Sequence, residues 1–577
     1  MSVVQVIQQV LRPADKQSRH IDVPSVAGDG HIDDVSVSRR EDLVLLRAQL
    51  SDVTNDSVQL SPRQQLSGEF WAQQLRLDPA AVPPNVHYLW CSGGRERWFE
   101  FKHYLSVLSV MRALQPHKIV FHYDSEPPVD KNQYNLWLRD LKNDAQFFIM
   151  QPMTGELADY CAGDRSARIQ LILRTLDAEG GYYVSENTWL LQVPAARAQQ
   201  DLEASLDLDS LDGYVMLRKN TYKQQCTALA DYVKDTSLKA SKSTCSPAHQ
   251  LYHADVKMVC TNVKGDKFER FYPMNIWDLD DPFGRLARKI FYGSEKILKP
   301  KPSYDKLVPN IAHMIWIGGG PMDFVFYLSL LSMLFVARVD VVFIHGDAPP
   351  HGVYWDKLQA LPRISARIKC IATAPPLSVY QGPIQPYYRA LMSDVIRVDL
   401  MIKYGGVYTD TDAIWTKPLT LEERGYDAVA CYDWVDWSYP YPDSVNFGVS
   451  YGKRNAPFWR LFRDSMRVLN NDLHGFTGVM YPYKILEKLP HLLRIDKRLS
   501  VICYYSRCHP IWVDDYHNMK KDHVVDNSIP NWRQDVHAFH WTYPNPSEYA
   551  NETALLQATG VFAEIGQNVL RLAGLIS

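Results

Sequence analysis

The chain has 577 residues, 46% of them hydrophobic, and a formal net charge of −3 at pH 7. This length leaves room for two or three domains, and the nearly balanced charge excludes the basic excess of nucleic-acid-binding proteins. The most apolar stretch, residues 324–344, is broken by Arg338 and Asp340. It therefore predicts a core helix followed by a core strand, and no transmembrane helix is predicted.

Residues 1–80 differ in composition from the rest of the chain. They are rich in Asp, Ser, Arg and Gln and have no strong apolar period, which predicts a largely disordered N-terminal extension. The first eleven residues contain three glutamines and lack the apolar run of a signal peptide.

Three short motifs occur twice, in the same order and at nearly the same spacing. The pairs are residues 86–94 with 311–319, 121–128 with 343–350, and 179–183 with 404–408. From Trp90 to Gly180 is 90 residues, and from Trp316 to Gly405 is 89. We therefore predict two copies of one domain, joined by a linker rich in Pro and Lys. The predicted ranges are 81–297 for the first copy, 298–306 for the linker and 307–577 for the second copy.

The second copy alternates short strands with helices. The predicted elements are residues 311–316, 322–336, 339–345, 353–361, 366–371, 388–403 and 407–410. This alternation predicts an α/β domain with a mainly parallel sheet, whose ligands bind outside the carboxyl ends of the strands.

The segment around Gly405 has the pattern of a metal site. Gly405 ends a predicted helix, and a short apolar strand then leads to Asp410 and Asp412. Residues two apart in an extended segment point to the same side, so both carboxylates can reach one hard cation. Asp394 and Arg397, three residues apart on the preceding helix, would lie beside this strand. A cation held by two carboxylates can clamp a diphosphate.

These motifs resemble a known family. Ser393-Asp394-x-x-Arg397, followed by residues 405–412 (GGVYTDTD), resembles the sugar-binding region of glycosyltransferase family 32. The two motifs, with residues 311–319 before them, also resemble the catalytic domain of the large clostridial glucosylating toxins. The resemblance covers roughly residues 307–545 and implies that the chain is two tandem GT-A-like domains with mixed, mainly parallel sheets flanked by helices.

The resemblance also implies an activity. The second copy would be a metal-dependent retaining glycosyltransferase that moves a hexose or N-acetylhexosamine from a nucleotide-diphosphate sugar to a glycan, glycolipid or protein acceptor. A UDP-sugar is the favoured donor and GDP-mannose the second candidate, with Mn²⁺ or Mg²⁺ as cofactor. No residue is an obvious covalent nucleophile, so retention implies front-face attack assisted by the leaving phosphate.

Five residues are assigned to the donor by this resemblance. Trp316 would stack on the nucleotide base, and Tyr408 and Trp541 would line the donor site. Arg397 would add a fixed positive charge, and Asp394 would accept hydrogen bonds from hydroxyls of the donor sugar.

Metal and acceptor residues are assigned in the same way. Asp410 and Asp412 would bind the metal, and His540 would be a third ligand or a contact of the diphosphate. His537, three residues earlier on a strand, would face the opposite side and could not join that site. Asn446 resembles the asparagine on the family's acceptor side.

The first copy lacks the metal carboxylates. In the register of the glycines, Asp410 corresponds to Ser185 and Asp412 to Asn187, while Glu186 would point to the other strand face. Ser and Asn are weak neutral ligands. We expect a non-catalytic first copy that acts as a structural or acceptor-binding partner; the alternative is a substrate site rebuilt from other residues.

Two other functions share these motifs. Both copies could form a non-catalytic scaffold that binds nucleotide sugars or glycans. The second copy could also hydrolyse nucleotide sugars without an acceptor.

The compartment is left open between the Golgi or endomembrane lumen, which the family resemblance favours, and the cytoplasm, since no anchor is visible. Nine scattered cysteines include two closely spaced pairs, Cys245 with Cys260 and Cys503 with Cys508. Residues 555–576 predict a helix that caps a domain or touches a membrane surface peripherally.

Overall fold

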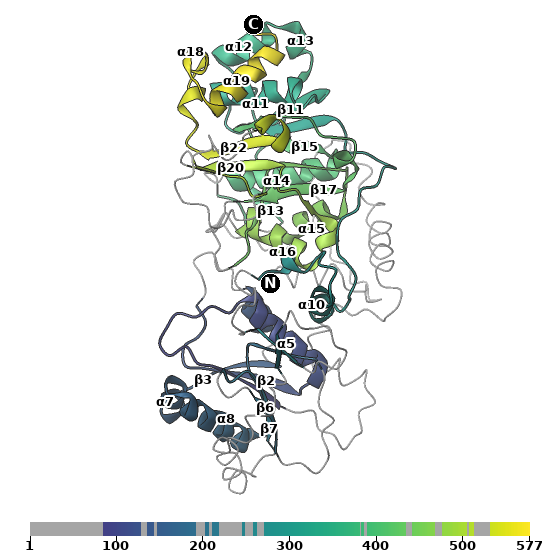
Figure 1. The fold of residues 1–577 in the computed structure, drawn as a ribbon. Helices are drawn as coiled ribbons and strands as arrows, with labels where there is room; N and C mark the ends of the chain where they lie inside the picture. The colour runs from purple at the N-terminus through teal and green to yellow at the C-terminus, as the bar shows by residue number, and fades with distance from the viewer. Residues whose placement is uncertain are drawn as a thin grey trace, which may run out of the picture.

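The computed structural model describes most of the chain after residue 84 (Figure 1). The described ranges are residues 85–128, 136–142, 147–191, 202–206, 210–217, 245–247, 258–261, 271–380, 382–385, 389–433, 441–467, 476–504, 507–512 and 531–577. The extension predicted for residues 1–80 lies outside them. We refer to residues 81–297 as the first half and residues 307–577 as the second half.

A seven-stranded sheet forms the centre of the second half. Its strands, in spatial order, are β12 (Ile368–Ala372), β11 (Val341–Gly346), β10 (Ile311–Ile315), β15 (Gly406–Thr409), β18 (Val445–Gly452), β17 (Ala428–Tyr432) and β19 (Arg494–Ile495). The first four strands run parallel, and β18 is antiparallel to both of its neighbours. The predicted α/β class with a mainly parallel sheet is therefore confirmed.

The first half contains a six-stranded sheet with the same order of strands. These are β3 (Phe148–Pro152), β2 (Lys118–Tyr123), β1 (Asn85–Trp90), β4 (Gly181–Val184), β7 (Gly213–Leu217) and β6 (Leu202–Leu206). Here too the first four strands are parallel and β7 is antiparallel to both neighbours. The two sheets agree strand by strand, apart from the extra edge strand β19.

Two helices cover opposite faces of the second sheet, because successive strand residues point to opposite faces. Val407 of β15 belongs to the core of α11 (Phe324–Phe335), and the next residue, Tyr408, belongs to the core of α14 (Arg389–Lys403). Helix α14 ends just before Gly405, whose φ of +65° favours glycine. In the first half, α5 (Phe101–Leu114) and α8 (Arg165–Glu179) take the corresponding places.

Smaller sheets flank both central sheets. In the second half, the strands are β16 (Ala413–Trp415), β22 (Ala538–Tyr543), β20 (Ser500–Tyr504) and β21 (Arg507–His509). In the first half, they are β5 (Thr188–Leu190), β9 (Met258–Cys260) and β8 (Cys245–Pro247). Each smaller sheet has at one edge the strand that comes directly after the last parallel strand of the central sheet in the chain. This strand is β16, after β15, in the second half and β5, after β4, in the first half.

The predicted C-terminal helix is two helices, α18 (Glu552–Gln557) and α19 (Val561–Leu572). Gly560, with a φ of +102°, separates them. Helix α19 buries Ile565 and Val569 in the same core as α11, so this segment caps the second half.

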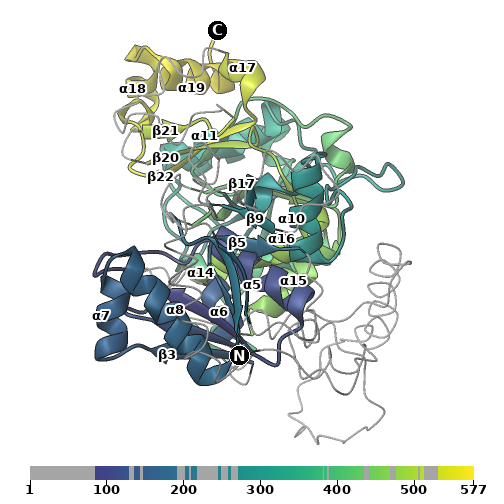
Figure 2. The ribbon, with the colours of Figure 1, turned by 60° about the horizontal axis from the view of Figure 1, so that its bottom comes forward.

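The two halves share one continuous apolar core. Buried residues of α5 and of α16 (Tyr481–Lys488) belong to the same cluster, and α10 (Pro282–Tyr292) lies beside both helices (Figures 1 and 2).

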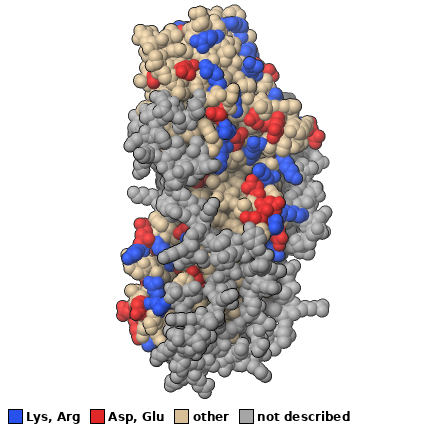
Figure 3. Space-filling model, in the orientation of Figure 1, with Lys and Arg blue, Asp and Glu red and all other residues tan. Residues whose placement is uncertain are grey.

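On the face shown in Figure 3, Lys and Arg side chains of the described residues are interspersed with Asp and Glu. None of the helices in the described part of the chain combines the length and apolarity needed to cross a bilayer.

Candidate active site

The two aspartates singled out in the sequence lie at the carboxyl end of β15. The strand ends at Thr409, and Asp410 to Asp412 form a turn that leads into β16. The expected extended segment is therefore wrong in detail. The carboxylates converge because the turn, closed by a hydrogen bond from the Ala413 amide to the Asp410 carbonyl, folds them toward one side.

The pairing of β16 with β22 places His540 beside the two aspartates, since Ala413 lies directly opposite His540. The imidazole Nε2 is 3.5 Å from Asp410 Oδ2 and 3.2 Å from Asp412 Oδ1, and one ligand atom from each residue lies within 4.8 Å of the others. Burial opposes the charged imidazolium, but Asp412 and Asp410 outweigh burial and raise the pKa of His540 to about 9.

The second oxygen of the Asp410 carboxylate is held in place by Tyr408 and Arg397. The Tyr408 hydroxyl donates to Asp410 Oδ1 at 2.6 Å, and Arg397 Nη2 lies 3.3 Å from the same oxygen. The guanidinium also lies 4.3 Å from the centroid of the Tyr408 ring. Burial raises the pKa of Tyr408 well above its ordinary value, so the phenol stays a proton donor. Oδ2 is thereby left facing His540.

Asp394 and Arg397 form a buried ion pair, with Nη1 3.3 Å from Oδ1 and both side chains at most 8% exposed. Burial opposes the charge of Arg397, but Tyr408 and the two carboxylates raise its pKa further. Gly478, in the π-helical turn η5 (Phe476–Met480), lies against Asp394, because an added Cβ would come within 2.2 Å of Asp394 Oδ2. Only glycine fits this close approach.

Asn446 lies on β18 next to these groups. Its Nδ2 donates to Asp433 Oδ1 at 3.0 Å, and its Oδ1 accepts from the Gly448 amide at 2.8 Å. An added Cβ on Gly448 would lie 2.2 Å from His540 Cε1 and 2.7 Å from Asp410 Oδ2. Gly448, Gly478 and Asp433 were not predicted from the sequence, because nothing in their local pattern points to a site on a distant strand.

The two tryptophans assigned to the donor lie in different surroundings. Trp316 is half-buried at the carboxyl end of β10, where it packs against Phe326 and donates to the Gly320 carbonyl at 3.1 Å. Trp541 is 2% exposed and packs between Tyr549 and Phe562 in the core. The Trp541 amide, rather than its ring, contacts the turn formed by Asp410 to Asp412, through a 3.3 Å hydrogen bond to the Asp412 carbonyl.

His537 lies apart from the two aspartates, as its spacing from His540 predicts. Its Nε2 is 2.8 Å from Glu423 Oε1, and Asp496 completes a second group of possible ligand atoms. Glu423 also accepts from the Thr420 amide, so this cluster ties the 3-10 turn η4 (Glu423–Gly425) to the start of β22.

A chain of two buried histidines supports the strands that carry the site. His313 Nε2 lies 3.0 Å from the Gly405 carbonyl, and His313 Nδ1 lies 3.0 Å from His345 Nε2. Burial lowers the pKa of His313 to about 4 and that of His345 to about 3, so both rings are neutral at pH 7. His87, His122 and the Gly180 carbonyl form the same chain in the first half.

The same register assigns first-half counterparts to Asp410, Asp412 and His540. Thr188 of β5 lies opposite Cys260, as Ala413 lies opposite His540. Cys260, which is disulfide-bonded, therefore stands in the place of His540. Asp394 and Arg397 lie eleven and eight residues before Gly405, and the residues at those distances before Gly180 are Ile169 and Ile172.

In the same register, Ser185 and Asn187 stand at the first-half positions that correspond to the two aspartates. Ser185 Oγ donates to Asp212 at 2.8 Å, and burial raises the pKa of Asp212 to about 6. None of the ligand types of the second-half cluster is therefore kept at its equivalent position.

Two disulfides are described in full. Cys503–Cys508, which the sequence indicated, joins β20 to β21, and Cys91–Cys161, which it did not, joins the end of β1 to α7 (Glu156–Ala162). The side chain of Cys245 lies outside the described part of the chain. Cys370 and Cys431 are free.

Comparison with known proteins agrees with this geometry. Residues 371–430 match the family described as "Glycosyltransferase sugar-binding region containing DXD motif". The match runs from β12 to β17 and contains Asp394, Arg397 and the two aspartates of the turn. This part of the chain is thus similar to the sugar-binding region of glycosyltransferases, and the Asp-x-Asp that it contains is Asp410 to Asp412.

The chain is also similar to individual proteins. Glucan organizing enzyme 1 of Cryptococcus neoformans var. grubii serotype A (strain H99) is 28% identical over 129 residues, which are 21% of this chain; the similarity spans about a third (33%) of that relative's length.

Among solved structures, the galactosyltransferase LgtC, in complex with donor and acceptor sugar analogs, is 13% identical over 46% of this chain and 96% of its own, with a TM-score of 0.26. The WbbM bifunctional glycosyltransferase is 9% identical over 85% of this chain and 99% of its own, with a TM-score of 0.29.

Proposed function

We propose that the second half is a metal-dependent retaining glycosyltransferase that transfers a hexose or N-acetylhexosamine from a nucleotide-diphosphate sugar to a glycan, glycolipid or protein. The observation that carries this proposal is the cluster of Asp410, Asp412 and His540, oriented by Tyr408 and Arg397 within the glycosyltransferase region. The family resemblance implies retention, and the lack of an obvious covalent nucleophile in the sequence then favours front-face attack assisted by the leaving phosphate.

The donor set fits a divalent cation. Two carboxylates and one imidazole suit Mn²⁺ once the cation has displaced the proton of His540, and the carboxylates suit Mg²⁺. Tyr408 and Arg397 occupy Asp410 Oδ1, so Oδ2 is the oxygen free to ligate, and it faces the His540 nitrogen. A bound cation would neutralise charge that develops on the leaving diphosphate.

The chain's own residues would then hold the donor. Arg397 presents a buried guanidinium beside the metal ligands and adds a fixed positive charge. Asp394, fixed by Arg397 and enclosed by Gly478, is positioned to accept from sugar hydroxyls. Trp316, half-buried at the end of β10, offers a ring for stacking on the base. Asn446 would orient the acceptor side of the site.

The matching sheets, their equivalent hydrogen bonds and the repeated motifs support two tandem GT-A-like domains, with ranges 81–297 and 307–577. The loss of all three metal-ligand types supports a non-catalytic first domain. The disulfides Cys91–Cys161 and Cys503–Cys508 favour an oxidising compartment such as the endomembrane lumen.

Titration of UDP and GDP tests the proposal. We would measure their affinity by calorimetry with and without Mn²⁺, for the wild-type chain, for Asp410→Ala/Asp412→Ala, and for Asp399→Ala. Asp399 is a matched control because it lies on α14 but is half exposed, in an ion pair with Arg463. Mn²⁺-dependent binding that only the double variant loses is expected. Equal binding by all three proteins would refute the metal assignment, and the absence of binding would favour a glycan-binding scaffold.

A further inference from the structure

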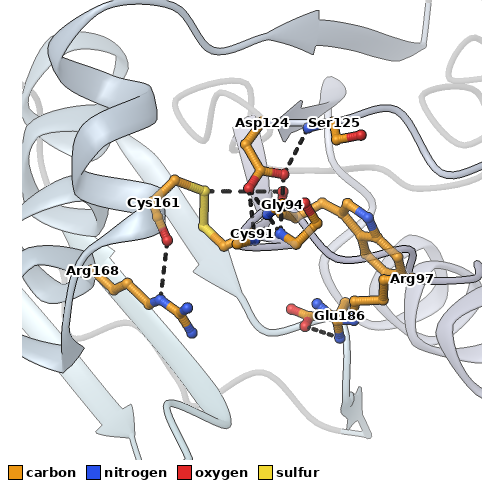
Figure 4. The surroundings of a disulfide bond; sticks show 11 residues. Cys91, Gly94, Arg97, Asp124, Ser125, Cys161, Arg168 and Glu186 are labelled. Carbon is orange, nitrogen blue, oxygen red and sulfur yellow. Dashed lines mark hydrogen bonds and ion pairs between the residues drawn. A yellow bond between two sulfur atoms is a disulfide. The ribbon is translucent and has the colours of Figure 1, made fainter.

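The first half closes its own equivalent of the site. The Arg97 guanidinium lies 4.1 Å from the centroid of Trp90, the residue equivalent to Trp316, and pairs with Glu186 at 2.5 Å (Figure 4). Glu186 lies between the equivalents of the two metal aspartates. The disulfide of Cys91 ties the same loop to α7. The Arg97 guanidinium thus lies against the Trp90 ring, whereas in the second half the ring of the equivalent Trp316 would stack on the nucleotide base.

The closed loop carries an aromatic contact to the second half. Trp98 packs edge to face against Tyr441, with ring centroids 6.0 Å apart, and Trp137 of α6 (Leu136–Lys142) lies 5.7 Å from the same ring. Tyr441 is 2% exposed and precedes β18, the strand that carries Asn446 and Gly448. The first half therefore holds the segment that enters the acceptor side of the site.

Trp137 also fixes a buried charge on α16. Its Nε1 donates to Glu487 Oε2 at 3.1 Å, and Lys484 donates to the other carboxylate oxygen at 2.9 Å. Glu487 is 0% exposed, so this carboxylate depends on its partners for stability. Tyr292 of α10 donates to the Glu487 carbonyl at 2.8 Å, so two elements of the first half hold the end of α16.

Helix α16 is continuous with the segment that packs against Asp394, the residue proposed to contact the donor sugar. It follows η5 without a break, and Gly478 of η5 lies against the carboxylate of Asp394. A shift of α16 along its axis would move Gly478 relative to Asp394, which has no space to adjust on that side.

We propose that the first half is a built-in positioning partner of the catalytic site. Trp137 acts through Glu487 and α16 on Asp394, and Trp98 and Trp137 act through Tyr441 on the start of β18. These aromatic residues touch no substrate; they set where the sugar-contacting groups lie. The inference rests on the proposed function, because it concerns binding of the sugar part of the donor.

A pair of chemically matched substitutions tests the inference in the full chain. Trp137→Phe removes the hydrogen bond to Glu487. Trp189→Phe removes an indole hydrogen bond of the same kind, to the Lys102 carbonyl at 3.0 Å, inside the first half and away from the second. The affinities of UDP, GDP, UDP-glucose, UDP-galactose, UDP-N-acetylglucosamine and GDP-mannose would be measured with Mn²⁺, together with the melting temperature.

Both variants are expected to lower the melting temperature. Only Trp137→Phe should weaken binding of the nucleotide sugar, by about 3- to 10-fold relative to the free nucleoside diphosphate, since small displacements of positioning groups have effects of this size or larger. Glu487→Gln weakens the same link, because a neutral amide accepts the Trp137 hydrogen bond less strongly than a carboxylate and no longer pairs with Lys484; it serves if Trp137→Phe does not fold.

Two results would overturn the inference in different ways. In the first, the wild-type chain binds nucleotide sugars, and Trp137→Phe and Glu487→Gln show the same ratio of nucleotide-sugar affinity to nucleoside-diphosphate affinity as Trp189→Phe. The positioning role is then wrong and the proposed function stands. If the wild-type chain binds no nucleotide with Mn²⁺, the proposed function fails and the inference falls with it.

Discussion

Gly448 gives the sharpest test of the site geometry. A methyl group at this position would lie 2.2 Å from His540 Cε1 and 2.7 Å from Asp410 Oδ2, whereas an ordinary contact between carbon atoms needs about 3.5 Å. In Gly448→Ala, His540 must therefore move by about 1 Å or more relative to β18, which changes its position beside the two aspartates. Overpacking of this kind costs about 1–3 kcal/mol of folding stability.

The displacement should also weaken the metal site. We expect Mn²⁺-dependent nucleotide affinity to fall about 10- to 100-fold, the range seen when groups that orient metal ligands are lost. This fall corresponds to about 1.4–2.7 kcal/mol. Calorimetric titration of Mn²⁺ with UDP or GDP measures it, and thermal unfolding measures the cost in stability.

A second substitution separates the clash from a general defect. Gly448→Ala/His540→Ala removes the atom that the new methyl group meets most closely, so it should regain stability relative to Gly448→Ala but not metal-dependent binding. Wild-type Mn²⁺ affinity in a folded Gly448→Ala variant would refute the packing of β18 against the metal ligands.

Two further predictions concern the supporting residues. Because the pKa values of His313 and His345 lie at about 4 and 3, below the ordinary 6.5, the unfolded chain takes up protons first as the pH falls below 6.5. The free energy of unfolding is therefore highest above pH 6.5 and falls toward pH 4. Each of the two histidines contributes a decrease of up to about 1.4 kcal/mol for every pH unit. His345→Gln, which keeps a donor for His313, should reduce the loss in free energy of unfolding between pH 6.5 and 5, and an unchanged pH dependence would contradict the buried neutral pair. Trp541→Ala should cost about 3–5 kcal/mol, as for other buried aromatic residues, whereas Trp541→Phe should fold and bind nucleotide like wild type if the ring serves only the core; a large loss of nucleotide affinity in folded Trp541→Phe would instead restore its predicted role at the donor.

Local patterns in the sequence were sufficient for much of the second half. The strands and helices around residues 311–410 occur close to their predicted positions, because the apolar period fixes which face of each element is buried. Gly405 ends α14 as predicted, and the separation of His537 from Asp410 and Asp412 also follows from strand geometry alone. The proposed class of enzyme rests on a short motif, which the family match at residues 371–430 contains.

Contacts between distant segments could be decided only by the tertiary structure. The meeting of His540 with Asp410 depends on the register of β22 against β16, which no local pattern specifies. Gly448 and Gly478 matter because two backbones approach the site closely, and a glycine's neighbours in space cannot be inferred from its neighbours in sequence. The pairing of Arg97 with Glu186 and the burial of Glu487 against Trp137 arise in the same way, because these partners are distant in sequence and meet only once the chain has folded. The sequence by itself determined the elements and the chemistry of the motif, whereas packing determined which residues surround it.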